Sequence, residues 1–97
     1  MRKVTQTTVN AFMCGEQCSL GNTVSSGDEL ILHGHIIAKR ENGRIFISNC
    51  GYETNTTKER LNGILLKMGV SKIYQKDFKW FWKNGEEFPY NKFVLVR

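Results

Sequence analysis

Aromatic and basic side chains alternate between Lys72 and Phe93, in a pattern that could bind an anionic partner. Eight of the eleven aromatic residues of the chain lie in this segment, together with five lysines. Aromatic rings on an exposed sheet face stack on unpaired bases, while lysines beside them bind phosphates. The same rings could instead form the core of a small domain. Because neighbouring residues of a strand point to opposite faces, the run Trp80-Phe81-Trp82 cannot all be buried from one strand.

The binding residues that this pattern predicts combine positive charge with large aromatic surface. Aromatic and arginine side chains are the usual energetic anchors of protein interfaces. The predicted residues are Lys76, Lys79, Trp80, Trp82 and Lys83, with Lys58 and Arg60 as supporting charges.

His33 and His35 lie two residues apart in an apolar stretch, so on one strand both would project from the same face. Such a pair could hold a metal ion, and the chain also has three cysteines, Cys14, Cys18 and Cys50. The spacing of Cys14 and Cys18 is not that of a common zinc knuckle, and Cys50 has no second ligand near it in sequence. We therefore expect no metal and no cofactor, and interpret the cysteines as small hydrophobic side chains.

The sequence holds no recognised catalytic motif. Cys50 could act as a nucleophile only if the fold brought His33 or His35 beside it. Glu53 and Glu59 lie where helix-start electrostatics already explain them. We therefore predict that the protein is not an enzyme and assign no catalytic residue. A small metal-dependent hydrolase or nuclease that uses His33 and His35 is retained as an alternative.

The composition is that of one globular domain spanning residues 1–97. The chain has 40% hydrophobic and 24% charged residues and a single proline. Its net charge is +5: residues 1–48 carry five basic and four acidic side chains, and residues 49–97 carry nine and five. A basic half attracts anionic partners and disfavours DNA mimicry. We expect an intracellular protein with no membrane partner, because no apolar run approaches the roughly 20 residues of a spanning helix.

Hydrophobic periodicity predicts two helices. The first covers residues 5–16, with Thr5 as its cap and apolar residues spaced three and four apart. The second covers residues 56–68 and shows a longer apolar stripe, with Thr56 and Glu59 at the spacing of a capping box.

Period-two alternation predicts strands in much of the remaining chain. The expected strands cover residues 30–38, 44–48, 78–82 and 93–96. Gly34 is expected to bend the first strand or to divide it in two. Asn42-Gly43 and Asn84-Gly85 are typical of tight hairpin turns. Residues 17–28 are interpreted as a loop with a short edge strand over 23–25. The result is an α+β fold, a small antiparallel sheet with two helices in the order α-β-β-α-β-β, with a further strand possible at the end.

Two regions in the middle of the chain resemble a known group of proteins. They are Leu32-His33-Gly34-His35-Ile36-Ile37-Ala38 with Gly43-Arg44-Ile45-Phe46-Ile47-Ser48-Asn49, and Thr54-Asn55-Thr56-Thr57-Lys58-Glu59-Arg60-Leu61-Asn62-Gly63. In these regions the chain is similar to small uncharacterised proteins of bacteriophages and prophages. The resemblance implies the cytoplasm of a bacterial host as the location, and it carries over no catalytic residue.

The phage context implies a protein that acts by binding. The leading hypothesis is a non-enzymatic protein that inhibits a bacterial defence system, as anti-CRISPR proteins do, through the basic, aromatic surface of the C-terminal half. Its partner would be a bacterial protein or a ribonucleoprotein defence complex. The alternative is a module that binds RNA or single-stranded DNA through the same face. Exposed sheet edges also leave a homodimer open.

Overall fold

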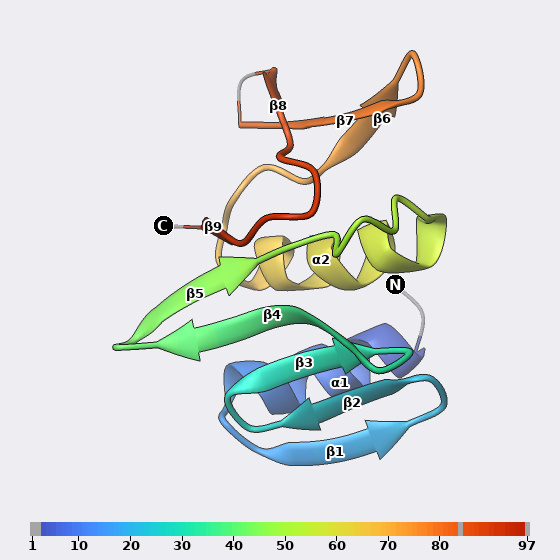
Figure 1. Ribbon diagram of the computed structural model, residues 1–97. Coiled ribbons are helices and arrows are strands. Elements are labelled where there is room, and N and C mark those ends of the chain that lie inside the picture. Colours follow the sequence, from blue (N-terminus) through green and yellow to red (C-terminus); the bar gives the residue numbers. More distant parts are fainter. Residues whose placement is uncertain (1–2, 84, 97) are drawn as a thin grey trace.

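The computed structural model describes residues 3–83 and 85–96, and its two sheets enclose a layer of two helices (Figure 1). The helices are α1 (Lys3–Met13) and α2 (Asn55–Lys67). The strands of the larger sheet are β1 (Gln17–Leu20), β2 (Thr23–Ser26), β3 (Glu29–Leu32), β4 (His35–Glu41), β5 (Arg44–Ile47) and β9 (Val94–Leu95). Those of the smaller sheet are β6 (Tyr74–Lys76), β7 (Lys79–Trp82) and β8 (Glu86–Glu87).

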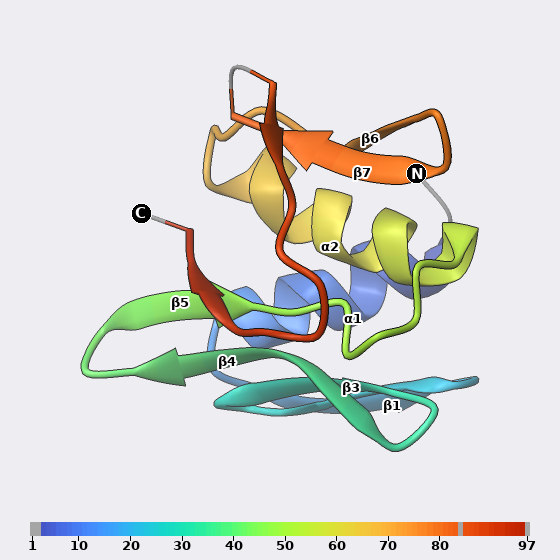
Figure 2. The same ribbon diagram turned by 45° about the horizontal axis from the view of Figure 1, so that its top comes forward.

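Both sheets are antiparallel between all neighbouring strands. The larger has the order β1-β2-β3-β4-β5-β9 and the smaller the order β6-β7-β8. Figure 2 shows both helices between the two sheets, with the small sheet above α2. Each sheet therefore buries one face against the helices, which confirms the predicted α+β class.

The core gathers apolar side chains from both helices and both sheets. Its largest buried members are Trp80, Phe12, Phe88, Leu30, Ile37, Ile47, Leu61, Ile64 and Leu65. The stripe predicted on the second helix accounts for Leu61, Ile64 and Leu65, all fully buried. The periodicity of the sequence thus identified the buried face of α2.

The apolar stretch around Gly34 forms two strands, one of the two alternatives that the sequence left open. His33 (φ 50°) and Gly34 (φ 80°) make the two-residue turn between Leu32 and His35, which are paired across β3 and β4. Positive φ at both turn positions matches the right-handed twist of a tight hairpin. The expectation that His33 and His35 project from one strand face is wrong, since His33 belongs to the turn.

The segment interpreted as a loop with a short edge strand, residues 17–28, is instead the β1–β2 hairpin and extends the larger sheet. The short strand expected over 23–25 is present as β2, but β1 and not β2 forms the edge of the sheet. The strands of this hairpin contain few apolar residues, so the alternation signal was weak. Polar contacts fix them in place. Thr23 and Ser25 are buried on β2, and the Ser25 hydroxyl donates to the carbonyl of Glu16 at 2.7 Å.

Both helix starts differ from those expected. The structure describes α1 from Lys3, so Thr5 lies within the helix and is fully buried instead of capping it. Helix α2 is capped by Thr54, whose hydroxyl accepts a hydrogen bond from the Thr57 N–H at 3.2 Å. Thr56 and Glu59 form no capping box, because the Glu59 carboxylate bonds to Arg60 and Thr5.

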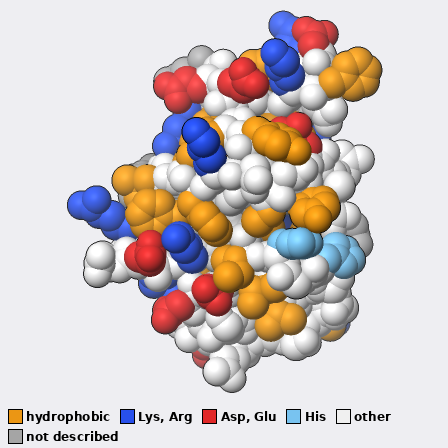
Figure 3. Space-filling model, in the orientation of Figure 1, with side chains coloured by type: hydrophobic (Ala, Val, Ile, Leu, Met, Phe, Trp, Pro, Cys, Tyr) orange, Lys and Arg blue, Asp and Glu red, His pale blue; other side chains and the backbone are white. Residues whose placement is uncertain are grey.

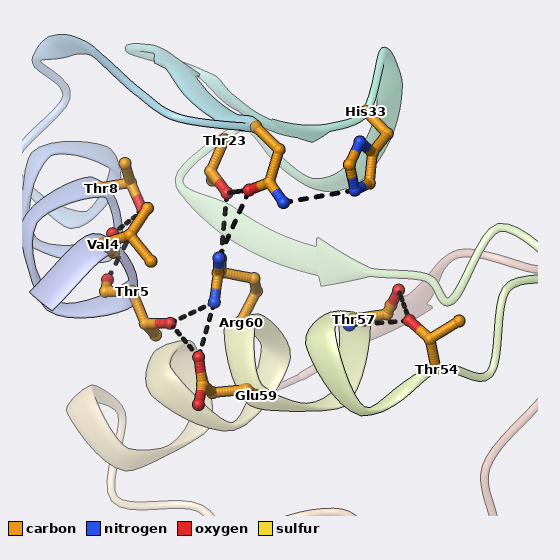
Figure 4. A network of polar contacts seen from close by, with 10 residues as sticks. Val4, Thr5, Thr8, Thr23, His33, Thr54, Thr57, Glu59 and Arg60 are labelled. Atoms are coloured by element: carbon orange, nitrogen blue, oxygen red, sulfur yellow. Dashed lines mark hydrogen bonds and ion pairs between the residues drawn. The ribbon is translucent and has the colours of Figure 1, made fainter. Parts of the chain in front are cut away.

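Arg60 is completely buried and joins α2 to α1 and β2 (Figure 4). Its guanidinium lies 2.6 Å from the Glu59 carboxylate and donates to the Thr23 hydroxyl at 2.9 Å. It also donates to the hydroxyl of Thr5, which in turn donates to Glu59. The prediction that Arg60 supplies a surface charge for binding is therefore wrong, because its charge is compensated inside the protein.

Helices α1 and α2 approach closely beside this cluster. A Cβ atom at Gly63 would lie 2.9 Å from the Thr5 Cγ2 atom and 3.1 Å from that of Val9. Only glycine therefore leaves room for α1 at its present distance.

The tryptophans of β7 lie on the inner face of the small sheet. Trp80 and Trp82 are 1% and 4% exposed, and the Phe88 ring packs against them with centroids 6.0 and 5.0 Å away. The prediction that these tryptophans bind a partner is wrong, since the rings close the core between the small sheet and the helices.

Two asparagines attach the C-terminal part of the chain to the rest. The Asn62 amide on α2 donates to the Ile73 carbonyl at 3.1 Å and accepts from the Ile73 N–H at 2.6 Å, just before β6 begins. The buried Asn49 accepts from the N–H groups of Gly51 (2.9 Å) and Asn91 (2.8 Å). These bonds fix the ends of the small sheet by satisfying backbone groups that no strand would pair.

Burial of both tryptophans predicts weak quenching of the native fluorescence. Acrylamide should quench the folded protein several-fold less efficiently than the urea-unfolded chain, because neither indole ring is accessible. The measurement is a Stern–Volmer titration in both states. Equal quenching constants in the two states would contradict the buried placement.

Arg60→Ala is expected to lower the free energy of unfolding by about 3–5 kcal/mol, because it leaves the other members of the buried cluster without their partner. Urea denaturation followed by circular dichroism measures this. Lys67→Ala is the matched control on the same helix, exposed and expected to change stability by less than about 0.5 kcal/mol. An Arg60→Ala protein as stable as the control would show that the cluster is unimportant.

Candidate functional site

The outer face of the small sheet carries aromatic rings and lysines. Since Trp80 and Trp82 point inward, Lys79 and Phe81 on the same strand point outward. Their partners on β6 are Lys76 and Tyr74, which share that face. The Tyr74 and Phe81 rings are stacked with centroids 5.8 Å apart. The sheet thus separates its buried indoles from a second, outward aromatic pair.

Lys76 and Lys79 lie directly opposite each other across β6 and β7, and both are exposed. Like charges at directly paired positions destabilise a sheet. The pair therefore contributes nothing favourable to the fold, and it places two positive charges side by side on the exposed face of the sheet.

Phe78 forms the tip of the β6–β7 hairpin and is 91% exposed. Asp77 and Phe78 have φ values of 53° and 65°, as a two-residue hairpin turn requires. A bulky residue at positive φ is uncommon and strained, and such strain is concentrated at functional positions. Figure 3 shows a hydrophobic side chain projecting at this tip with charged groups of both signs nearby.

We refer to Tyr74, Lys76, Phe78, Lys79 and Phe81 together as the hairpin surface.

Acidic side chains border the hairpin surface. Asp77 lies in the turn, and the exposed Glu86 and Glu87 form β8, with Glu87 paired to Phe81. The basic side chains within residues 74–87 are Lys76, Lys79 and Lys83. This segment therefore carries equal numbers of acidic and basic side chains. The excess positive charge of the C-terminal half is not concentrated on this sheet.

The structure separates the other predicted binding lysines from the hairpin surface. The Lys83 ammonium lies 4.3 Å from the Trp82 ring centroid and donates to the Val96 carbonyl at 2.8 Å, so it takes part in the fold. Lys58 is half-buried on α2 and lines a groove along that helix. Of the seven residues predicted to bind, Lys76 and Lys79 lie together on an exposed face.

Tyr74, Phe78 and Phe81 were not predicted as binding residues. The alternation of β7 contained the signal, because inward tryptophans require an outward Phe81. In the expected strand over residues 78–82, period-two alternation would put Phe78 on the same face as Trp80 and Trp82, but its position in the turn removes it from that face.

The two histidines border a cavity of about 310 Å³ between the β3–β4 turn and the start of α2. His33 lies 3.2 Å from the Asn22 amide nitrogen, and the His35 ring lies 4.6 Å from that of Tyr52. Among the residues that the structure describes, no three His, Cys, Asp or Glu side chains gather as a metal site. This geometry gives the metal-dependent hydrolase alternative no support.

The three cysteines are free thiols. Cys14 is exposed, and Cys18 and Cys50 are half-buried. The Cys50 thiol donates to the Ile36 carbonyl at 2.9 Å. Cys50 packs against the hydrophobic core, as the interpretation of the cysteines as small hydrophobic side chains requires, whereas Cys14 is exposed.

Comparison with known proteins assigns the chain to a phage group. No helix within residues 3–83 and 85–96 is long and apolar enough to cross a membrane. No curated protein and no solved structure matches the chain. The family model described as Kyanoviridae Gp96 protein, a phage protein family, matches residues 1–95. Because the match covers nearly the whole sequence, the chain belongs to the Kyanoviridae Gp96 protein family.

Proposed function

We propose that this phage protein acts by direct binding to a protein of the bacterial host, and that the hairpin surface is its contact site. The observation that carries the proposal is Phe78, a large ring that is 91% exposed on a strained turn. Burying such a ring against a partner would contribute about 1.5–3 kcal/mol. The exposed ring buries almost no apolar surface within the protein, so it does not stabilise the fold.

The charges around the ring favour a protein partner over a nucleic acid. Asp77 lies between the two lysines in the turn, and Glu87 is paired with Phe81 on their face of the sheet, so a phosphate backbone would meet these carboxylates as well as the ammonium groups. A protein surface can pair with both signs of charge, and an aromatic anchor at the centre is typical of such interfaces.

The partner class that we propose is a component of a bacterial defence complex, which the protein would inhibit as anti-CRISPR proteins do. Membership of a phage family supports a bacterial partner. A binding mode without catalysis fits the exposed aromatic and lysine side chains, which offer contact area and charge. The proposed site of action is the host cytoplasm.

Two variants test the hairpin surface. Phe78→Ser and the double variant Lys76→Glu with Lys79→Glu are expected to fold normally, because all three side chains are exposed. Each should weaken partner binding at least about tenfold, equivalent to about 1.4 kcal/mol. Partners are captured from hosts with active defence systems, identified, and then titrated in purified form.

Lys92→Glu is the matched control, an exposed lysine outside the small sheet that should retain wild-type affinity. In a host with the relevant defence system, the wild-type protein and this control should restore plating of a sensitive phage, and the hairpin variants should not. Failure to capture any specific partner would contradict the proposal. So would tight binding to bare oligonucleotides that weakens steeply with salt, which would favour the nucleic-acid alternative.

A further inference from the structure

A groove of about 590 Å³ runs along α2, separate from the hairpin surface. Its lining residues on α2 follow the helical repeat and form one continuous stripe. They are Asn55, Lys58, Glu59, Asn62, Gly63 and Leu66, and the segment after the helix adds Val70 and Lys72. From Asn55 to Leu66 the stripe is about 16 Å long at 1.5 Å per residue.

The charge facing this groove is positive. Lys58 and Lys72 both line it. Among the described lining residues the one carboxylate is that of Glu59, which is 2.6 Å from the Arg60 guanidinium and accepts a hydrogen bond from Thr5, so its charge is compensated within the protein. The two ammonium groups therefore give the described lining of the groove a positive potential, which attracts an acidic occupant.

The C-terminal end of the groove is apolar. Leu66 is 66% exposed, although the other leucines of α2, Leu61 and Leu65, are fully buried. Val70 lies beside it in the lining and is half-buried. Leu66 thus offers most of its side chain to whatever enters the groove.

We propose that this groove binds an acidic, extended peptide segment of a partner protein, with an apolar side chain over Leu66 and Val70 and carboxylates beside Lys58 and Lys72. Charge complementarity selects this occupant. At about 3.3 Å per residue, an extended segment of about five residues fills the stripe. The proposal goes beyond the hairpin surface, because it assigns a second site with its own ligand chemistry.

The experiment uses a fluorescently labelled peptide of alternating leucine and aspartate, titrated with the full-length protein and followed by anisotropy. A peptide with lysine in place of aspartate serves as the ligand control. We expect the acidic peptide to bind and the basic one to bind at least about tenfold more weakly. Leu66→Asp, and the double variant Lys58→Glu with Lys72→Glu, should each reduce affinity for the acidic peptide by about tenfold or more.

Lys67→Glu is the matched control variant, because Lys67 is exposed on the same helix and does not line the groove. It should keep the wild-type affinity to within about twofold. Circular dichroism of every variant confirms that a loss of binding is not a loss of fold.

Three results would overturn the groove proposal. They are equal binding of the acidic and basic peptides, an equal loss of affinity in Lys67→Glu, and no binding at all. A wild-type dimer that Leu66→Asp dissociates in sedimentation would assign the groove to a second copy and also overturn it. Capture of the host partner through the hairpin surface does not involve Leu66, so the two proposals fail independently.

Discussion

The buried charge of Arg60 needs compensating partners, and the arrangement of the surrounding elements depends on supplying them. Removing a guanidinium from water costs several kcal/mol, and this cost is offset only when every partner is in place. Those partners come from three elements: Thr5 from α1, Glu59 from α2 itself and Thr23 from β2. A slip of either helix by one turn, or of β2 by one residue, would leave the charge without a partner. The cluster therefore fixes how α1, α2 and β2 are aligned with one another.

The position of Gly63 allows Thr5 to reach the buried charge of Arg60. It lies one turn after Glu59 on α2 and lets α1 approach until the Thr5 hydroxyl reaches the ion pair. The residue before Gly63, Asn62, holds the backbone at Ile73 and so fixes where β6 begins. One helix thus positions both sheets, the larger through Arg60 and the smaller through Asn62. The outward direction of Lys79 and Phe81 follows from that placement, because Trp80 and Trp82 must reach the core.

The sequence was sufficient for features that depend on local pattern, and insufficient for those that depend on partners distant in the chain. Helix α2 and the β4–β5 hairpin follow from an apolar stripe and from Asn42-Gly43, both local signals. The predicted Asn84-Gly85 turn lies partly outside the described residues, and the strands before and after it, β7 and β8, are antiparallel neighbours with Trp82 opposite Glu86. Strand β1 was missed and β2 was expected only as a short edge strand, because this hairpin is held by polar contacts and by the pairing of β2 with β3.

The candidate site was half predictable for the same reason. Lys76 and Lys79 could be selected by charge alone, whereas the choice between tryptophan and phenylalanine required knowing which face of β7 meets the helices. Arg60 illustrates the opposite error. An arginine on a polar helix segment looks like a surface charge, and the residues that bury it, Thr5 and Thr23, are 55 and 37 positions away in the chain.

At the turn formed by Asp77 and Phe78, folding stability and the proposed binding favour different residues. Glycine at position 78 would take the required φ of 65° without strain, and the hairpin would gain by the exchange. Directed evolution for thermal tolerance alone would therefore replace this phenylalanine, and the resulting protein would be sturdier but without its most exposed ring. If Phe78 anchors the contact that we propose, selection for infection of a defended host would reject the same exchange. The proposed contact therefore implies opposite rankings of phenylalanine and glycine when a library at this codon is screened under the two regimes.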